Sequence, residues 1–391
     1  METLQPKLRF SEFNEDWKDK ELGNIFKITA GGDIGKENVS QIKNEIFKYP
    51  IYANAEKNKG FYGYSDIYKV VENVITVAGR GVNIGIAHAR DHKFYPIVRL
   101  LVLIPKKNEN IYFFEYQINR LNLFKESTGV PQLTAPQVSG YKVFYPQLSE
   151  QTKIANFLSA IDTKINQLTQ KKNLLEQYKK GIMQKIFSQE LRFKDDNGKD
   201  FPQWIKKVLS EIFDYKKGSG LSKEKLDING CNKCVLYGEL YTKYNEVIVD
   251  VISKTNSNEG LLSESGDLLI PSSTTTSGID LANVTALKFD NILLGGDITV
   301  LRSNQQIDSV FYAYYLSNHK KKEIASYAQG ITIIHLYYSH IKEMILDFPV
   351  YEEQTKIANF LFAIDDKINK VSNQLEKTNE YKKGLLQQMF V

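Results

Sequence analysis

Hydrophobic residues recur at steps of three and four positions along two long stretches of the chain. In residues 150–187, and again in 353–390, they form the apolar stripe of a coiled-coil helix, sustained for about five heptads. At a rise of about 1.5 Å per residue, each helix would be roughly 55 Å long. The residues that we expect at the paired seam are Ile154, Leu158, Ile161, Ile165 and Leu168 in the first helix and Ile357, Leu361, Ile364, Ile368 and Val371 in the second.

The two helical stretches are copies of one another. EQTKIANFLSAIDTKINQ begins at Glu150, and EQTKIANFLFAIDDKINK begins 203 residues later at Glu353; without a gap, 21 of 38 positions agree. A repeat of this strength indicates duplication. Because an isolated helix cannot bury such a stripe, we expect each copy to pair with the other.

The regions around the helices have the pattern of short strands and helices. The runs VVENVITVAG, YPIVRLLVLIP, LLSESGDLLIPSS and DITVLRS are typical of buried strands, whereas INRLNLFK and SVFYAYYLSNHKKKEIASYA predict helices. Trp17 returns as Trp204, and the LRF at Leu8 returns at Leu191. We therefore expect an α/β protein with two mixed α/β domains, separated by two long helices that pair as an antiparallel coiled coil with pseudo-twofold symmetry.

The expected segments follow from this organisation. Residues 1–149 form the first globular domain, 150–187 the first spacer helix, 188–351 the second globular domain and 352–391 the second spacer helix.

Charge and composition narrow the class of protein. The net charge is +5, and the two repeated stretches carry all of it, with seven lysines against three acids and six against five. Any nucleic-acid site must therefore be a local patch or be completed by a partner. No run of eighteen apolar residues predicts a membrane span, and two cysteines in 391 residues suit a reducing compartment, so we expect a cytoplasmic protein.

The segments that resemble catalytic or metal-binding motifs each lack required residues. GGDIGKE at Gly31 lacks the first glycine and the hydroxyl residue of a P-loop, and AGRGVNIG lacks the dinucleotide spacing. Cys231 and Cys234 have metal-ligand spacing but no further ligands that fit a zinc pattern. We expect no catalytic residue and no metal site in this chain.

Several polar residues remain as candidates for binding DNA. Arginine is scarce, at seven residues against 44 lysines, and Arg80 lies between two glycines close to Asn83; arginine and asparagine are favoured readers of guanine and adenine. The hydroxyl-rich run 272–277 could bind phosphates or bases, although a solvated loop fits it equally well, as a surface arginine fits Arg80. The candidates for DNA contact are Lys36, Arg80, Asn83, Arg90, Thr128, Gln132, Thr134, Lys216, Lys217, Lys223, Ser272, Ser273, Thr274, Thr275, Thr276, Gln329 and Thr332.

This arrangement resembles the specificity subunits of type I restriction–modification systems, the HsdS family. The resemblance covers the whole chain and rests on EQTKIANFLSAIDTKI and EQTKIANFLFAIDDKI, each after an aromatic-proline pair, and more weakly on VITVAGRGVNIG and GDLLIPSSTTT. It implies that the two globular domains are target-recognition domains, each reading one half of a split double-stranded DNA sequence. The paired helices would fix the gap between the halves.

The same resemblance implies partners and cofactors. Two modification subunits would use S-adenosylmethionine to methylate adenine, and two restriction subunits would use ATP and Mg²⁺, while this chain binds no cofactor and catalyses nothing. The outward faces of the repeated helices would dock the modification subunits, through Gln151, Lys153, Asn156, Gln354, Lys356 and Asn359.

Other classes of function remain open at this point. A stand-alone bipartite DNA-binding regulator would bind its site without partners. A structural adaptor would use its two heads on proteins or glycans, without any dependence on DNA. An enzyme built on Cys231 and Cys234 is the weakest of these alternatives.

Overall fold

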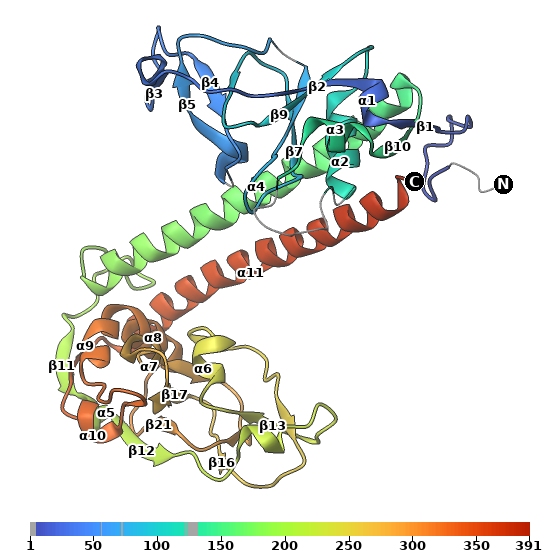
Figure 1. Cartoon of the computed structure of the whole chain (residues 1–391). Coiled ribbons are helices and arrows are strands. Elements are labelled where there is room, and N and C mark those ends of the chain that lie inside the picture. The colour runs from blue at the N-terminus through green and yellow to red at the C-terminus, as the bar shows by residue number, and fades with distance from the viewer. Residues whose placement is uncertain (1–4, 56, 72, 122, 124–131) are drawn as a thin grey trace. The chain divides into compact units, whose positions relative to one another are not determined.

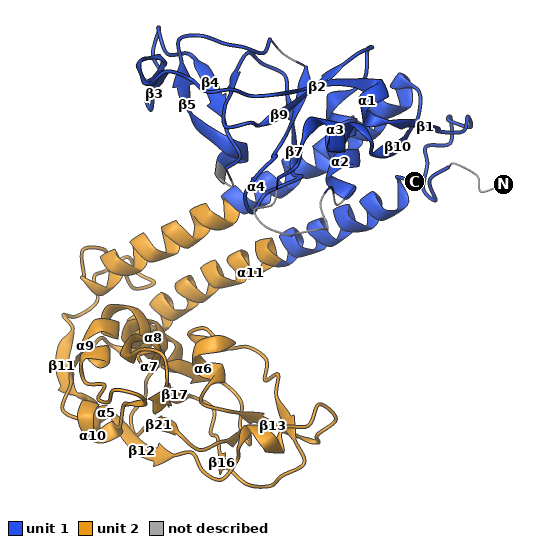
Figure 2. Ribbon diagram, viewed as in Figure 1, with its two compact units in different colours: residues 1–170, 373–391 blue, residues 171–372 orange. Residues whose placement is uncertain are grey.

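The computed structural model describes residues 5–55, 57–71, 73–121, 123 and 132–391 (Figure 1). The chain divides into two compact units, shown in different colours in Figure 2: unit 1 comprises Met1–Gln170 and Asn373–Val391, and unit 2 comprises Lys171–Ser372. Each unit contains a globular part and one end of each long helix.

The two long helices are α4 (Leu148–Phe187) and α11 (Tyr351–Gln388). In unit 1, Leu158 near the start of α4 shares a hydrophobic core with Leu385 near the end of α11. In unit 2, Ile186 near the end of α4 shares a core with Leu361 near the start of α11. Opposite ends therefore meet, which confirms that the helices pair antiparallel.

The predicted seam positions face into these cores or into the helix pair. Ile161, Ile165 and Ile368 are half-buried, and the other seven are buried: Ile154, Leu158, Leu168, Ile357, Leu361, Ile364 and Val371. Near the helix ends, the apolar stripe packs against the globular parts as well as against the partner helix.

Unit 1 contains two four-stranded sheets and a two-stranded sheet. The order of strands is β2-β9-β6-β7 in the first, β3-β5-β4-β8 in the second and β1-β10 in the third. The strands are β1 (Lys18–Glu21), β2 (Phe26–Ala30), β3 (Val39–Ser40), β4 (Tyr49–Tyr52), β5 (Phe61–Ser65), β6 (Val74–Val77), β7 (Ala87–Arg90), β8 (Tyr95–Pro96), β9 (Leu101–Pro105) and β10 (Lys142–Tyr145). The short helices are α1 (Leu22–Ile25), η1 (Lys36–Asn38), η2 (Lys57–Gly60), α2 (Ile111–Arg120) and α3 (Ala135–Ser139).

The local sequence explains these elements. All four residues of β6 are buried, as the β-branched run VITV predicts. Helix α2 begins where the side chain of Asn110 accepts hydrogen bonds from two backbone N–H groups, and it packs on β7. It ends at Arg120, so the predicted helix over residues 118–125 is confirmed for 118–120 and wrong for Leu121 and Leu123, while its other positions lie outside the described residues.

Unit 2 repeats the plan with one strand more in its main sheet. The orders are β12-β21-β17-β19-β14, β15-β13-β20-β16, β11-β23 and β18-β22. The strands are β11 (Ile205–Val208), β12 (Phe213–Lys217), β13 (Asn232–Val235), β14 (Val247–Ile248), β15 (Lys254–Thr255), β16 (Leu261–Leu262), β17 (Asp267–Pro271), β18 (Ser273–Thr274), β19 (Thr285–Leu287), β20 (Leu293–Leu294), β21 (Ile298–Ser303), β22 (Ile334–His335) and β23 (Ile345–Phe348). The helices are α5 (Leu209–Ile212), η3 (Lys223–Lys225), α6 (Glu239–Thr242), α7 (Gly278–Leu281), α8 (Ser309–Tyr314), η4 (Tyr315–His319), α9 (Lys321–Ser326) and α10 (Tyr338–Ile341).

The strand registers identify equivalent positions in the two units. Phe26 pairs with Pro105 and Ala30 with Leu101 across β2 and β9, while Phe213 pairs with Ser303 and Lys217 with Thr299 across β12 and β21. The strands β2, β9 and β6 of unit 1 thus correspond in order and register to β12, β21 and β17 of unit 2. Among the described helices, none has the length and apolar character that crossing a membrane requires.

Candidate nucleic-acid interface

One end of the main sheet in each unit gathers most of the candidate residues. In unit 1, β2 and β6 end where their antiparallel neighbour β9 begins, so the segments that follow Ala30 and Val77 and precede Leu101 leave the sheet together. We call this the loop end of unit 1. The loop end of unit 2 lies where β12 and β17 end and β21 begins.

Arg80 and Gln132 form a pair at the loop end of unit 1. Their backbones make an antiparallel bridge, and Arg80 Nη2 donates to Gln132 Oε1 at 2.7 Å. The next residue, Leu133, donates its N–H to the carbonyl of Gly79 at 2.8 Å. The guanidinium is half-buried and held in one orientation, with donors remaining for a ligand.

The segment that leads into β9 at the same loop end has an unusual backbone. Val98 and Arg99 are both left-handed, with φ of 52° and 55°, a conformation that a β-branched residue adopts only under strain. The Asn54 side chain holds the strained segment by donating to the carbonyl of Val98 at 2.6 Å and accepting from Gly79 N–H at 2.8 Å. The side chain of Arg99 is exposed.

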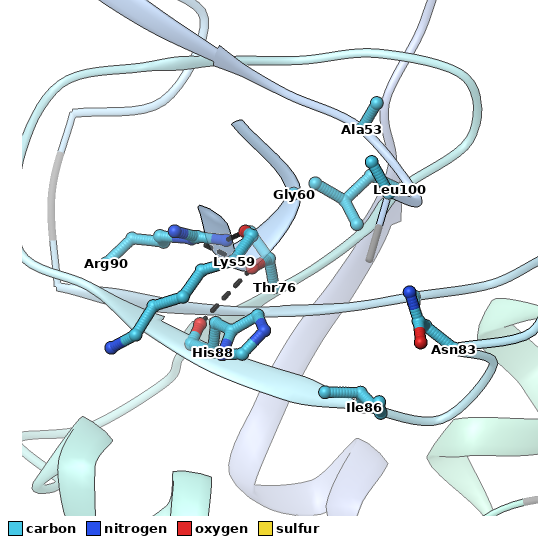
Figure 3. A pocket seen from close by; sticks show the side chains of 11 residues that line it. Ala53, Lys59, Gly60, Thr76, Asn83, Ile86, His88, Arg90 and Leu100 are labelled. Carbon is cyan, nitrogen blue, oxygen red and sulfur yellow. Dashed lines mark hydrogen bonds between the residues drawn. The ribbon is translucent and has the colours of Figure 1, made fainter. Parts of the chain in front are cut away.

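A hollow of about 320 Å³ lies at this loop end, and Figure 3 shows side chains that line it. Asn83 lines this hollow and is half-buried, so its side chain remains accessible to a ligand. Arg90 also reaches the wall but is only 3% exposed.

The prediction that Arg90 contacts DNA needs correction. Its Nε donates to Thr76 Oγ1 at 3.0 Å, its Nη2 donates to the carbonyl of Lys59, and its guanidinium lies 3.6 Å from the centre of the Tyr52 ring. Burial lowers the pKa of Arg90 and raises the pKa of Tyr52. Because its donors are used inside the unit, Arg90 supports the wall of the hollow.

The remaining candidates of unit 1 fall in different places. Lys36 is exposed in η1, after the end of β2. Thr134 is the N-cap of α3, where its hydroxyl and the Gln137 side chain form a capping box, so its polar atoms already have partners. Thr128 lies outside the described residues.

Lysines and hydroxyl groups meet at the loop end of unit 2. Lys216 and Lys217 are exposed at the end of β12, and Lys223 is exposed in η3. Lys223 lines a hollow of about 720 Å³ together with Asp297 at the start of β21. Each loop end thus borders a hollow.

The hydroxyl-rich run 272–277 is only partly available to a ligand. Ser272, Ser273 and Thr274 are each at most 5% exposed, and their prediction as DNA contacts needs correction. Ser272 Oγ bonds Thr299 Oγ1 at 2.8 Å, Ser273 Oγ donates to Asp297 Oδ2 at 3.0 Å, and Thr274 Oγ1 bonds Thr276 Oγ1 at 2.8 Å. Only Thr275 and Thr276 of the five candidates are exposed.

The run enters a two-stranded sheet because β18 pairs with β22. Ser273 lies opposite His335, and Leu336 donates its N–H to the carbonyl of Ser272 at 3.0 Å. The connection that leads into β22 contains Gln329 and Thr332, both exposed, and Ile331, which is 99% exposed. These residues lie at the loop end of unit 2.

Sequence reasoning missed a buried ion pair that anchors each long helix. Glu150 is fully buried and accepts from Arg9 Nε and Nη2, each at 2.7 Å, and from Trp17 Nε1 at 3.3 Å. The hydrogen bond and charge of Glu150 raise the pKa of Arg9.

Unit 2 contains the same anchor. Glu353 is fully buried and accepts from Arg192 at 3.1 and 2.7 Å and from Trp204 Nε1 at 2.8 Å. The signal was present in the sequence, since each acid opens a repeated helix, and each arginine belongs to the recurring LRF.

Two of the six docking candidates are buried, which corrects their expected outward position. Gln151 and Gln354 are at most 1% exposed. Gln151 accepts from the N–H of Asn110 and donates to the carbonyl of Pro146, both at 2.9 Å; Gln354 accepts from Asp308 at 2.9 Å and donates to Pro349 at 2.8 Å. Both amides are satisfied inside the unit and join the long helix to the short helix beside it.

The other four docking candidates remain near the surface. Lys153, Asn156 and Asn359 are exposed, and Lys356 is half-buried. Lys153 pairs with Glu12, and Lys356 pairs with Asp196 at 2.6 Å. Their docking role stays a prediction.

A third matched cluster ties the two long helices together. In unit 1, Asp162 of α4 lies 2.5 Å from Lys382 Nζ of α11 and accepts from the hydroxyl of Tyr116. In unit 2, Asp365 of α11 lies 2.8 Å from Lys179 Nζ of α4 and accepts from the hydroxyl of Tyr314.

Burial and neighbouring charges shift the pKa values of side chains in these clusters. Burial and the bond to Asp162 raise the pKa of Tyr116, and burial also raises the pKa of Asp365 despite Lys179. Asp162 with Lys382 and Asp365 with Lys179 therefore hold the helix pair together.

The described residues contain no group of three or more side chains suited to a metal ion. Cys231 is exposed and Cys234 is buried. Burial raises the pKa of Cys234 to about 11, which keeps the thiol protonated and unreactive at neutral pH.

Comparison with known proteins gives matches along most of the chain. The model of the family described as type I restriction modification DNA specificity domain matches residues 14–177 and again 203–378. A type I specificity subunit from Mycoplasma pneumoniae is 34% identical over 158 residues, which are 40% of this chain and 42% of that protein. This alignment thus spans less than half the length of that relative.

Longer matches have lower identity. The specificity subunit of the type I restriction enzyme MjaVIII from Methanocaldococcus jannaschii is 23% identical, with 95% of this chain and 91% of that protein aligned. The crystal structure of a type I restriction-modification system S subunit from M. genitalium covers 99% of both chains with a TM-score of 0.68 at 19% identity, a likeness of fold.

Proposed function

The chain belongs to the type I restriction modification DNA specificity family, and we propose that it is the DNA sequence-specificity subunit of a type I restriction–modification complex. Proteins of this family are specificity subunits, which are not catalytic themselves. In the proposed complex, each unit reads one half of a bipartite DNA target, and the paired helices set the gap between the halves.

The observation that carries this proposal is that the chain contains the same recognition architecture twice. Both family matches contain a complete main sheet whose loop end presents exposed basic and polar residues beside a hollow. Two similar readers in one chain suit a target made of two separate half-sites. The stand-alone regulator shares this argument, but the relatives are subunits of restriction–modification systems.

The partners and cofactors extend the proposal. Two modification subunits dock on the exposed faces of α4 and α11 and use S-adenosylmethionine to methylate adenine; two restriction subunits join the full complex and use ATP and Mg²⁺. The anchors that begin α4 and α11 are alike, which suits two identical partners. The modest net charge of +5 also suits a chain whose partners share the phosphate contacts.

The test is a genome-wide map of N6-methyladenine in cells with and without the gene, with the modification subunit present. We expect a split sequence to be methylated only when this chain is present. Identical maps, with the modification subunit confirmed as active, would contradict the proposal. Tight binding of the isolated chain to selected DNA would then favour the stand-alone regulator.

A further inference from the structure

At matched backbone positions, the two loop ends carry side chains of opposite charge. Strand registers equate Leu101 with Thr299, so Arg99 corresponds to Asp297, and both residues are left-handed, with φ of 55° and 59°. The bridge between Arg80 and Gln132 corresponds to the pairing of Ser273 with His335. In each unit the following leucine bonds back to the residue before the bridge, Gly79 or Ser272.

The charged group at each loop end is held by a neighbouring polar side chain. Gln132 Oε1 accepts from Arg80 Nη2 at 2.7 Å in unit 1, and Ser273 Oγ donates to Asp297 Oδ2 at 3.0 Å in unit 2. Within the part of the chain that the structure describes, neither Arg80 nor Gln132 makes another side-chain hydrogen bond. Asp297 is exposed beside its hollow, and Arg99 is exposed at the matching position.

Among the groups at these matched positions, the free hydrogen-bonding atoms therefore have opposite character in the two units. Unit 1 offers the remaining N–H groups of Arg80, the amide N–H groups of Gln132 and the guanidinium of Arg99, which are all donors. Unit 2 offers the carboxylate of Asp297, which only accepts. In the major groove, guanine presents two acceptors, whereas cytosine and adenine present an amino group.

From this contrast we propose that Arg80, fixed by Gln132, makes unit 1 select a guanine, and that Asp297, fixed by Ser273, makes unit 2 select a base with an exocyclic amino group, cytosine or adenine. The inference rests on the proposed function, because it assigns a base to each of the two reading units. A reader held in place by its neighbour loses less conformational freedom on binding, so it discriminates more strongly than a free side chain.

The experiment uses the chain in complex with its modification subunits and a library of duplexes in which each base of both half-sites is varied singly. For Arg80→Ala, we expect discrimination for guanine at one position of one half-site to fall by about tenfold or more, with the other half-site unchanged. For Asp297→Ala, we expect the same loss for an amino-bearing base in the opposite half-site only.

Matched controls separate base reading from general affinity. Lys36→Ala and Lys217→Ala remove exposed charges at the same loop ends and should weaken binding to all duplexes about equally. If either alanine variant melts below the wild-type complex, Arg80→Gln and Asp297→Asn replace it, since each keeps a polar side chain at the site and removes the charge.

The outcomes distinguish the two proposals. Unaltered base preferences in the folded Arg80 and Asp297 variants, or a change in the half-site of the other unit, would overturn the inference and leave the proposed function standing. A wild-type complex that modifies no split sequence would overturn the proposed function itself.

Discussion

Units 1 and 2 share their frame and differ where they would meet a ligand. The frame is matched almost bond for bond: Glu150 and Glu353 accept from an arginine and a tryptophan, and Gln151 and Gln354 bond the N–H of the residue that caps the adjacent helix. At the loop ends, Arg99 is replaced by Asp297 on the same backbone conformation. The comparison separates the contacts that hold the architecture from the residues that can vary to set specificity.

One difference lies inside the frame. Lys179 of unit 2 contacts both Asp365, at 2.8 Å, and Glu246, at 3.2 Å. Within the described residues, Lys382 of unit 1 forms an ion pair with Asp162 alone. Unit 2 thus contains a half-buried lysine between two carboxylates. Glu246 directly precedes β14, the extra strand at the edge of the main sheet of unit 2, so the frame tolerates an added charge there.

The largest effect is expected from Leu158→Asp and Leu361→Asp. Both leucines are fully buried in the core of their own unit, so each aspartate should destabilise that unit by about 4 kcal/mol or more. Hydrogen exchange should show lost protection in unit 1 for the first variant and in unit 2 for the second, and methylation should be abolished in both. The exposed neighbours Asn156→Asp and Asn359→Asp serve as controls, and equal protection in test and control variants would contradict the role of the seam.

A slightly smaller and matched effect is expected from Glu150→Gln and Glu353→Gln. Each change leaves Arg9 or Arg192 without its carboxylate partner. Breaking a buried ion pair in this way destabilises a protein by about 3–5 kcal/mol. Denaturant unfolding followed by hydrogen exchange checks whether the two losses are similar. A large loss in one unit and none in the other would show that the anchors are not equivalent. The control is Lys153→Met, which breaks an exposed pair and should change stability by less than about 1 kcal/mol.

The two lysines of the helix pair should respond differently to pH. Lys179→Met leaves Asp365 and Glu246 together without a cation, so the pKa values of both carboxyls should rise above those of the unfolded chain. The folded state then binds more protons than the unfolded state, and stability should fall as pH rises from about 4 to 7. Lys382→Met leaves one carboxylate in unit 1 and should show a weaker slope. Thermal unfolding across this pH range measures both, and a steeper slope for Lys382→Met would contradict the comparison.

The smallest effect is expected from Lys216→Gln combined with Lys217→Gln. Both side chains are exposed at the loop end of unit 2, where they would neutralise phosphates. Their loss should reduce the slope of log affinity against log salt by about 2 without changing the preferred sequence. Titration of the complex with its duplex at several salt concentrations measures this slope. An altered sequence preference would show that these lysines read bases.

The sequence predicted the frame better than it predicted the site. The heptad stripe located α4 and α11, because a stripe on a helix has to be buried wherever the helix packs. The anchors escaped notice because an acid at the start of a helix is usually solvated, and only tertiary packing buries Glu150 beside Arg9.

The wrong predictions at the candidate interface also arose because tertiary packing is not visible in the sequence. Gln151 was placed on an outward docking face by the family resemblance, yet its amide satisfies two backbone groups inside the unit. Ser272 and Ser273 were taken as candidate free hydroxyls because the sequence does not reveal that β18 pairs with β22, or that the two hydroxyls bond Thr299 and Asp297. Whether a polar side chain is satisfied within the fold depends on segments distant in sequence.

The most direct test of two independent readers exchanges residues 1–149 for the first domain of another family member with a known, different target. The methylated sequence of the exchanged complex is then mapped across a genome. We predict that one half of the split sequence changes to that of the donor, while the other half remains as in the parent. A change in both halves, or in neither, would contradict the account.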